Sequence, residues 1–465
     1  MSDGAHYDLI VIGAGPGGYV SAIRASQLGL KAAVVEKDRP GGVCLNWGCI
    51  PSKAILHCAE LVESISGAER YGIRCQNLSI DYGKVIDYSR KIADQLAQGV
   101  QYLLKKNHVD LLSGAGSFLA PNEILIRGKE ERKITAPRIL IATGSREKSL
   151  PGLKIDGKSV VTSHEALVLK DLPESVLIIG GGAVGAEFGY AYRSFGAKTT
   201  IVEMMDHLLP EMDEELGQEL EKSFKRKKIE VLIRTQYKSI ELSGEGRPKV
   251  TLKAREGGET SLDAQLVLVA VGREASTDNL GLENLKLETE KGFIKVDGQY
   301  QTTCKGVYAI GDVIGAPLLA HAASAEGIAA VEIMAGQPRN KIERCEVPAC
   351  VYCQPEVAGI GLTEREAKTG EADIKIGKFP FRASGKAMAM GQTEGWVKVI
   401  AGKNGEILGV HMIGKGVTDL IAEAGLGQKL EATARELGRT VHAHPTLSEA
   451  LMEAALAASG EAINI

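Results

Sequence analysis

The chain has 465 residues, of which 44% are hydrophobic and 25% charged, and its net charge is −4 at pH 7. This length predicts two to four domains, and the charge gives no reason to expect nucleic acid or an anionic membrane as a partner. Eight irregularly spaced cysteines exclude a small disulfide-stapled scaffold. No apolar run is long enough to cross a bilayer, and the first predicted strand begins near Tyr7, so we expect no signal peptide. The pattern indicates a cytoplasmic enzyme, although a processed organellar protein would have the same pattern.

The first motif is a glycine-rich turn between an apolar run and a helical pattern. Residues 7–12 lead into Gly13, Gly15 and Gly18, and a second apolar run ends at Glu36. Strand, glycine turn, helix, strand and acid is the order of a dinucleotide-binding fold. In that fold the glycines admit the pyrophosphate, and the carboxylate takes the ribose hydroxyls.

The same pattern recurs at the same spacing in the middle of the chain. Residues 176–179 lead into Gly180, Gly182 and Gly185, and the following strand ends at Glu203. Two copies predict two nucleotide sites on two similar domains. The Glu203 carboxylate would repel a 2′-phosphate, and no arginine follows it directly, so we expect NAD rather than NADP at the second site.

Between the two copies lies the stretch Gly-Gly-Val-Cys-Leu-Asn-Trp-Gly-Cys-Ile-Pro-Ser-Lys, residues 41–53. Its cysteines, Cys44 and Cys49, do not have the CxxC spacing of a zinc knuckle or a thioredoxin motif. On one and a half helical turns they would approach bonding distance, and a helix N-terminus would favour a low thiol pKa. Lys53 adds a positive charge nearby. Taken alone, such a pair would more often be two buried structural cysteines.

The remaining elements predict how the chain is divided. Residues 53–106 have helical periodicity, and 139–141 form a buried strand before Thr143 and Gly144. The segment 266–272 repeats that shape, and a later strand ends at Asp312. From about residue 345 strand-like alternation at 396–400 and 407–413 is followed by helices. We predict an α/β fold with two Rossmann-like dinucleotide-binding domains and an α+β C-terminal domain. The predicted boundaries are 1–146, 147–275, 276–345 (the first domain resumed) and 346–465.

A histidine and a carboxylate stand close together near the end of the chain. His444 precedes a proline, and Glu449 lies five residues later at the start of a predicted helix. A carboxylate bound to an imidazole fixes its tautomer and raises its basicity, which is how a general base is made. An isolated pair of this kind would more often be a surface ion pair.

In this order, these motifs resemble the pyridine nucleotide–disulfide oxidoreductases, flavoenzymes that pass electrons between a dithiol and a nicotinamide through FAD. The resemblance covers the whole chain. It implies that Cys44 is the interchange thiol and that Cys49 is the thiol beside the flavin. It also implies that Lys53 lies near the flavin and pairs with Glu187.

The resemblance extends to the base and to the cofactor contacts. His444 would be the base, supported by Glu449, and would reach the cysteines of the other subunit, so that the C-terminal domain is a dimerisation domain and the homodimer is required. The expected FAD contacts are Gly13, Gly15, Gly18, Glu36, Lys53, Gly116, Thr143, Gly144, Asp312 and Ala320. The expected NAD contacts are Gly180, Gly182, Val184, Gly185, Glu203, Ala270 and Gly272. No metal is expected.

Within the family, four segments favour members that oxidise protein-bound dihydrolipoyl groups with NAD⁺: 49–53, 270–273, 319–321 and 444–449. The expected partner is therefore the lipoyl-bearing acyltransferase or carrier protein of a 2-oxo acid dehydrogenase or glycine cleavage complex. The sequence does not indicate which complex.

Other members of the family fit less well. Glutathione and trypanothione reductases need NADPH, and mercuric reductase carries a C-terminal cysteine pair. A transhydrogenase or NADH oxidase would not need both cysteines, and a non-catalytic flavoprotein subunit would not need the base. Val43, Trp47 and Ala322 depart from the family pattern, and a CxxC at Cys350 and Cys353 is not expected to bind metal or act in redox chemistry.

Overall fold

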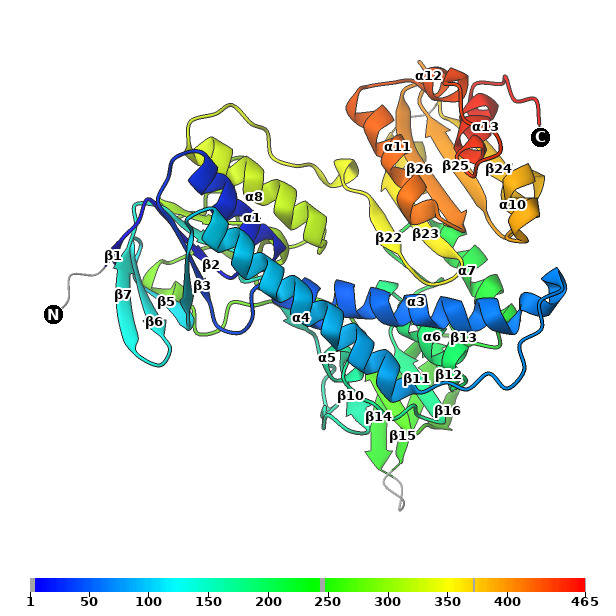
Figure 1. Cartoon of the computed structure of the whole chain (residues 1–465), viewed down its shortest axis with the longest axis horizontal. Helices are drawn as coiled ribbons and strands as arrows, with labels where there is room; N and C mark the ends of the chain where they lie inside the picture. Colours follow the sequence, from blue (N-terminus) through cyan, green and yellow to red (C-terminus); the bar gives the residue numbers. More distant parts are fainter. Residues whose placement is uncertain (1–4, 243–246, 371–372, 465) are drawn as a thin grey trace. The chain divides into compact units, whose positions relative to one another are not determined.

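A computed structural model describes residues 5–242, 247–370 and 373–464 (Figure 1). The chain forms two compact units, each assembled from segments that are distant in sequence. Unit 1 comprises residues 1–54, 86–148 and 272–344, and unit 2 comprises 55–85, 149–271 and 345–465. The divisions at 54/55 and 85/86 fall inside two helices, α3 (Cys49–Ser66) and α4 (Tyr82–Lys106). The sequence predicts helix throughout 53–106, but a 3₁₀ turn, η1 (Ala68–Tyr71), and a non-helical stretch separate α3 from α4 because Gly72 adopts a left-handed conformation (φ 81°).

Unit 1 is built on a five-stranded parallel sheet. Its strand order is β21 (Val307–Ala309), β8 (Ile139–Ile141), β2 (Leu9–Ile12), β3 (Ala32–Glu36) and β4 (Asp110–Ser113). The last strand in sequence, β21, pairs with β8, so the sheet is completed by residues that follow the second glycine motif.

Both faces of this sheet are buried, which explains why its strands read as continuous apolar runs. On one face Leu9 and Val11 pack in a core with Ala22 of α1 (Pro16–Gln27) and Ala330 of α8 (Ala320–Met334). On the other face Ile10 packs with residues of a four-stranded sheet ordered β1 (Ala5–His6), β7 (Glu131–Thr135), β6 (Glu123–Arg127) and β5 (Ala115–Ala120). The remaining elements of unit 1 are α2 (Gly42–Trp47), the pairs β9 (Ser145–Glu147) with β18 (Arg273–Ala275) and β19 (Thr289–Glu290) with β20 (Phe293–Ile294), η2 (Leu282–Asn284) and η3 (Gly311–Ile314).

Unit 2 contains a second parallel sheet of the same design. Its order is β10 (Val160–Val161), β17 (Leu266–Val269), β11 (Ser175–Ile179), β12 (Lys198–Val202) and β13 (Glu230–Leu232). One face packs against a three-stranded antiparallel sheet of β14 (Thr235–Leu242), β15 (Pro248–Ala254) and β16 (Glu259–Asp263). The helices of this region are α5 (Ser163–Ala166), α6 (Ala183–Phe195) and α7 (Glu214–Arg226).

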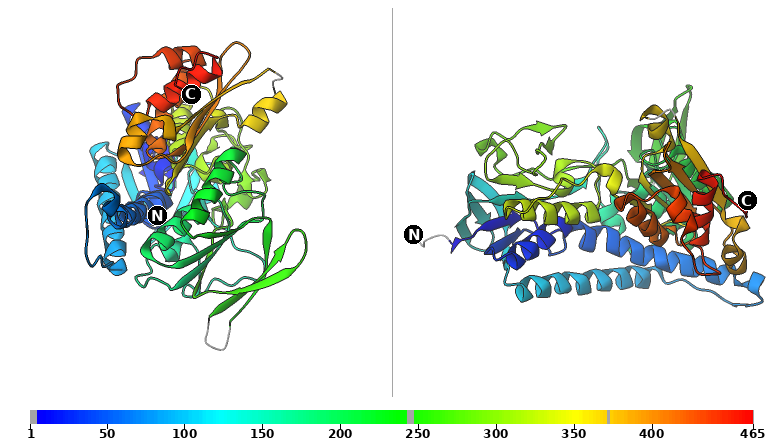
Figure 2. Two further views of the ribbon diagram at one scale, coloured as in Figure 1. Left: turned by 90° about the vertical axis from the view of Figure 1, so that its right-hand side faces the viewer. Right: turned by 90° about the horizontal axis from the view of Figure 1, so that it is seen from above.

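The C-terminal part of unit 2 is an antiparallel sheet covered by helices (Figure 2). Its order is β22 (Ala349–Val351), β23 (Glu356–Gly361), β26 (Ile407–Gly414), β25 (Trp396–Ala401) and β24 (Lys375–Pro380). A single apolar core joins this sheet to α11 (Val417–Lys429), α12 (Ala434–Arg439) and α13 (Glu449–Ala458). Shorter elements are η4 (Arg344–Glu346), α9 (Glu364–Gly370), η5 (Phe381–Ala383) and α10 (Gly385–Met390).

The fold class predicted from the sequence is confirmed: two Rossmann-like sheets and an α+β C-terminal region. The predicted domain boundaries stay a prediction. Among residues 5–242, 247–370 and 373–464, no helix combines the length and the apolar composition that spanning a bilayer requires.

Candidate active site

The residues expected to contact FAD follow the strands of the unit 1 parallel sheet. Gly13 comes directly after β2, Glu36 ends β3, Thr143 is the second residue after β8, and Asp312 lies just beyond β21. Parallel strands present their carboxyl ends at one edge, and in open α/β sheets ligands bind in the crevice there. Four stretches that are distant in sequence therefore meet at one nucleotide edge.

The glycines at this edge serve two different purposes. Gly13 has φ 104°, and a Cβ there would lie 2.4 Å from the Ala142 carbonyl oxygen, while a Cβ at Gly18 would lie 1.9 Å from the Gly13 carbonyl oxygen. These two positions need glycine for close backbone packing. A Cβ at Gly15 would meet only the Gly42 Cα, at 4.0 Å, and one at Gly144 would meet nothing within 4 Å.

The open positions leave room that FAD fits. Beside Gly144, the Thr143 hydroxyl is buried and has no hydrogen-bond partner among the residues that the structure describes. An unpartnered buried hydroxyl next to open backbone suits the polar groups of a dinucleotide. The Glu36 carboxylate is oriented by the backbone amides of Ala14 (2.7 Å) and Asp38 (2.8 Å), which donate to its two oxygens.

Asp312 is held at the same edge by a short chain of polar groups. The Ser145 hydroxyl donates to its carboxylate, and Arg273 Nε donates to the Ser145 oxygen at 2.7 Å. Burial raises the pKa of Asp312. Of the other expected contacts, Gly116 packs against the side chain of Val35, and Ala320 is the first residue of α8.

The second glycine turn repeats this geometry in unit 2. Gly180 has φ 111°, and a Cβ there would lie 2.2 Å from the Ala270 carbonyl oxygen, whereas Gly182 faces open space. A Cβ at Gly185 would lie 1.9 Å from the Gly180 carbonyl oxygen. The close packing and the open central glycine fit the pyrophosphate of NAD.

The Glu203 carboxylate follows β12 and is 5% exposed. It accepts hydrogen bonds from the backbone amides of Gly181 (2.6 Å) and Met205 (2.8 Å). Val184 is partly exposed in the first turn of α6. Gly272 has φ 108° and faces open space, but it belongs to unit 1, so its contact with NAD stays a prediction.

The two cysteines lie on separate helices. Cys44 is inside α2, Cys49 is the first residue of α3, and Gly48 between them has a non-helical backbone (φ −153°). The sequence leaves open whether a helix continues through this stretch or restarts near Pro51, and the structure shows that a second helix begins at Cys49. Neither cysteine is in a disulfide in the structure. The start of α2 lies against the first glycine turn, because the Gly41 amide donates to the Ala14 carbonyl oxygen at 2.8 Å.

The thiols interact directly. The hydrogen bond to the Cys49 thiol and, secondly, burial raise the pKa of Cys44, although the positive charge of Lys53 acts to lower it. The low pKa that a helix N-terminus would favour is therefore not found at Cys44, which lies inside α2 and shares a hydrogen bond with a second thiol.

Trp47 lies between the cysteines in sequence and is fixed to its surroundings. Its Nε1 donates to the Asp38 carboxylate at 3.0 Å, and the Arg90 guanidinium lies 4.5 Å from its ring centroid. Arg90 also donates to the Asn46 carbonyl oxygen. The sequence pattern does not single out Arg90, because it lies more than 40 positions away on α4.

His444 and Glu449 form the expected pair. His444 Nδ1 lies 2.8 Å from Glu449 Oε1, and the Thr446 amide donates to the other carboxylate oxygen at 2.8 Å. The His444 side chain is 78% exposed, which leaves Nε2 free to face a substrate. Burial acts to raise the pKa of Glu449, but the hydrogen bonds from Thr446 and His444 outweigh it and lower that pKa.

Glu187 is buried in α6 and accepts a hydrogen bond from the Tyr352 amide at 3.1 Å. Lys53 lies one turn after Cys49 on α3. These two residues belong to different units, so their pairing stays a prediction.

The remaining positions that the sequence singles out lie on several elements. Cys350 is on β22, whereas Cys353 lies beyond the strand and is buried, and burial raises the Cys353 pKa well above its ordinary value. Ala322 is buried in α8, and Val43 is exposed on α2.

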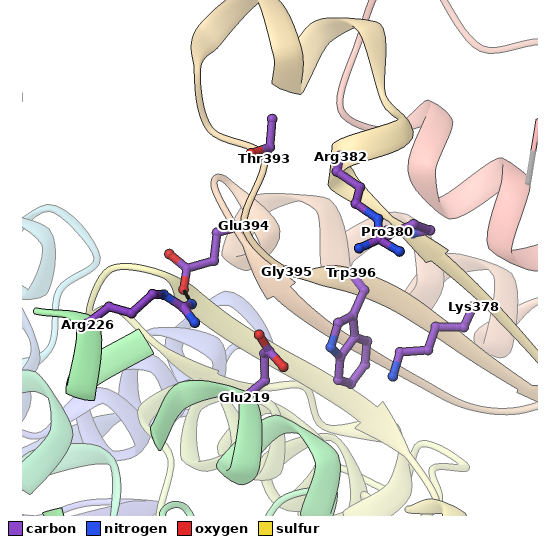
Figure 3. A pocket seen from close by; sticks show the side chains of 9 residues that line it. All are labelled: Glu219, Arg226, Lys378, Pro380, Arg382, Thr393, Glu394, Gly395 and Trp396. Carbon is purple, nitrogen blue, oxygen red and sulfur yellow. Dashed lines mark hydrogen bonds and ion pairs between the residues drawn. The ribbon is translucent and has the colours of Figure 1, made fainter. Parts of the chain in front are cut away.

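A cavity of about 700 Å³ lies between α7 and the ends of β24 and β25 (Figure 3). Arg226 forms an ion pair with Glu394 across it, and the Lys378 ammonium lies 3.9 Å from the Trp396 ring centroid. Lys378 also donates to Glu215 at 3.1 Å. Because these charges are already paired within the protein, we assign the cavity no role.

Comparisons with known proteins identify the family of this chain. The family model described as pyridine nucleotide-disulphide oxidoreductase matches residues 7–327, and the model of the family's dimerisation domain matches residues 347–455. A dihydrolipoyl dehydrogenase of Bacillus subtilis (strain 168) is 45% identical over 98% of this chain and 99% of its own. One from Zymomonas mobilis is 42% identical over 99% of each chain. A crystal structure of LpdA from Mycobacterium tuberculosis has a TM-score of 0.89 and 25% identity, covering 97% of this chain and 99% of that one. The chain therefore belongs to the pyridine nucleotide-disulphide oxidoreductase family.

Proposed function

We propose that this protein oxidises protein-bound dihydrolipoyl groups to lipoyl groups, with FAD as its cofactor and NAD⁺ as the electron acceptor. The observation that carries the proposal is the hydrogen bond between the thiols of Cys44 and Cys49. Cys44 lies on α2, and this helix begins against the glycine turn of the expected FAD site. The relatives named dihydrolipoyl dehydrogenase, which match over nearly their full length, support the same reaction.

The thiols carry the substrate chemistry. In the oxidised enzyme Cys44 and Cys49 form a disulfide, and a dihydrolipoyl thiolate attacks the Cys44 sulfur, which releases Cys49 as a thiolate. The second substrate thiolate then attacks the substrate sulfur that is bonded to Cys44 in this mixed disulfide, and the bond to the Cys44 sulfur breaks. Lipoyl disulfide leaves, and Cys44 is left as a thiol after taking up a proton. The hydrogen bond between the two thiols in the structure fits this two-electron reduced state.

His444 moves the protons. Its Nδ1 is engaged by Glu449, so its exposed Nε2 is the atom that takes the proton from the attacking substrate thiol. In the family arrangement this imidazole acts on the cysteines of the partner subunit, and the match of residues 347–455 to a dimerisation domain supports a homodimer.

FAD would be held by the unit 1 edge, from Gly13, Gly15 and Gly18 through Glu36, Gly116, Thr143, Gly144, Asp312 and Ala320, with Lys53 near its ring. When bound, it supplies the two-electron acceptor between the Cys49 thiolate and NAD⁺. NAD would be held by Gly180, Gly182, Val184, Gly185, Glu203, Ala270 and Gly272, with Glu187 close to the nicotinamide.

The wider assembly follows from the substrate. Its partner is the lipoyl-bearing acyltransferase or carrier protein of a 2-oxo acid dehydrogenase or glycine cleavage complex. The FAD domain would comprise residues 1–146 and 276–345, the NAD domain 147–275 and the dimerisation domain 346–465. The three main sheets support this division. A cytoplasmic location stays a prediction.

Anaerobic titration of the yellow holoenzyme with dihydrolipoamide tests the reaction. We expect a new long-wavelength absorption from a thiolate beside the flavin, followed by stoichiometric NADH when NAD⁺ is added. The Cys75→Ser variant, which changes an exposed cysteine outside the site, should behave as the wild type. Failure of the dithiol to reduce the flavin, combined with ready reduction by NADH or NADPH, would contradict the proposed substrate.

A further inference from the structure

The segment that presents His444 has one buried anchor. Residues 440–448 join α12 to α13 without regular structure. Within residues 440–445, only the His442 side chain is buried, with 5% exposed, whereas Val441 is 95% exposed and the His444 side chain 78%. An exposed irregular segment loses conformational freedom only if something holds it.

Both ring nitrogens of His442 meet oxygen acceptors. Nδ1 lies 2.7 Å from the Thr440 carbonyl oxygen, and Nε2 lies 2.7 Å from Glu423 Oε1 on α11. The ring is therefore held at both nitrogens, by the backbone of its own segment and by the carboxylate of a neighbouring helix. Charge-assisted hydrogen bonds of this length are stronger than neutral ones. The segment is therefore tied to α11 at His442.

We propose that His442 is a positioning residue for His444, which acts by fixing the segment from which the exposed imidazole reaches its substrate. The proposal rests on the proposed function, in which His444 is the base. The bond between His444 and Glu449 orients the ring toward α13, but it does not hold the backbone that precedes it. The Thr446 hydroxyl holds Ala443 from the C-terminal side at 2.8 Å, and the His442–Glu423 pair holds the segment from the N-terminal side.

His442 also acts on the dyad through space. It contributes to lowering the pKa of Glu449, although burial acts to raise that pKa and the hydrogen bonds from Thr446 and His444 lower it more. The titratable groups that the structure places around His442 are Glu423 of α11, His444 of its own segment and Glu449 of α13. His442 is thus coupled to the dyad both by the backbone and through space.

Two isosteric variants separate the contacts of His442. His442→Gln keeps a donor near the Nε2 position, toward Glu423, and His442→Asn keeps a donor near the Nδ1 position, toward Thr440. His442→Ala keeps neither. His6→Gln changes an exposed histidine, which contacts Thr135, and serves as the control. Each holoenzyme is assayed for dihydrolipoamide oxidation by NAD⁺ and for ferricyanide reduction by NADH, which needs the flavin but not the base. The thermal midpoint of each variant is also measured.

A positioning role predicts a specific pattern. His442→Ala should lower kcat for dihydrolipoamide by about 10- to 100-fold, since small misplacements of a catalytic group have effects of that size. Ferricyanide reduction should stay within about twofold of the wild type, because an interaction used only in one step affects only that step. His442→Gln should recover more activity than His442→Asn, because it restores the tie to α11.

Two results would overturn the proposal. One is an unchanged kcat in His442→Ala. The other is a parallel loss of both activities with a lowered thermal midpoint in all three variants, which would make the pair purely structural. If the wild-type holoenzyme itself does not oxidise dihydrolipoamide but reduces another disulfide with NADH, then the proposed function fails. The same comparison of variants, run with that disulfide, then tests the positioning role by itself.

Discussion

The ammonium group of Lys398 lies 2.7 Å from the Asp213 carboxylate, and the two side chains are 1% and 3% exposed. Lys398 is on β25, and Asp213 is the N-cap of α7, so this ion pair joins the second nucleotide region of unit 2 to its C-terminal sheet. Lys398 also contacts Glu215 at 2.8 Å and Glu364 at 3.0 Å. A buried lysine that faces three carboxylates leaves them uncompensated when it is removed.

Replacement of this lysine should destabilise the protein strongly. We expect Lys398→Met to lower the free energy of unfolding by about 3–5 kcal/mol, because it leaves the buried Asp213 carboxylate unpaired. Lys378→Met is the matched control: Lys378 pairs with Glu215 nearer the surface, where such a pair contributes about 1 kcal/mol or less. Urea unfolding followed by circular dichroism measures both. Equal losses of unfolding free energy in the two variants would show that burial does not determine how much each lysine contributes to stability.

Acid should weaken the same cluster. Burial acts to raise the pKa of Asp213, but the His411 and Lys398 contacts bring it below its ordinary value, and its stabilisation is lost as pH falls through that lowered pKa. Burial lowers the pKa of His411, so His411 opposes folding once the unfolded chain protonates below about pH 6.5. The thermal midpoint should therefore decrease when the pH is lowered past about 6.5, and it should decrease further when the pH is lowered past about 4. In Lys398→Met the carboxylates protonate readily. The difference in thermal midpoint between this variant and the wild type should therefore become smaller in acid.

The two cysteines should be distinguishable by colour. Cys44→Ser and Cys49→Ser should each reduce dihydrolipoamide oxidation by about 10³-fold or more, since both thiols are needed for one exchange. Only Cys44→Ser should keep the long-wavelength band, because the proposed reaction assigns Cys49 as the thiolate beside the flavin. Visible spectra of the reduced variants test this. A band in Cys49→Ser alone would reverse the two roles.

Glu449→Gln should separate geometry from charge in the base. The amide preserves the shape of the side chain but not the carboxylate that fixes the His444 tautomer, so we expect kcat to fall by about 10²-fold. Glu436→Gln is the control, since Glu436 is an exposed capping carboxylate that contacts Thr433. Steady-state kinetics of the two variants should differ in kcat, and a normal kcat in Glu449→Gln would remove Glu449 from the mechanism.

The choice of nucleotide should depend on Glu203. Glu203→Gln retains one acceptor for the amides of Gly181 and Met205 but removes the charge that would repel a 2′-phosphate. The preference for NAD⁺ over NADP⁺, measured as the ratio of kcat/KM values, should fall by about tenfold. An unchanged ratio would place the discrimination elsewhere in the site.

Local patterns carried most of the information that the sequence contains about this fold. The glycine turns after β2 and β11 could be placed because strand, turn and helix are adjacent in sequence, and the acids Glu36 and Glu203 follow at a fixed spacing. The His444–Glu449 pair was also readable, since only four residues separate its members.

Contacts between distant segments could not be read in this way. Lys398 and Asp213 are 185 positions apart, and no periodicity links them. Likewise, His442 is bound by Glu423 from another helix, although it stands two residues from a residue that the pattern identifies. The raised pKa of Cys44 is a further example, because a helix N-terminus is a local signal in the sequence, whereas the effect of the Cys49 thiol depends on the turn at Gly48.

The interruption at Gly48 places the two sulfur atoms on separate rigid segments that meet at a single residue. The α3 segment is fixed from its first turn, where the Ser52 amide donates to the Gly48 carbonyl oxygen at 3.0 Å. The proposed reaction opens and closes a disulfide in every cycle. We expect the accompanying backbone change to be confined to Gly48, which has no side chain, so that neither helix loses a turn.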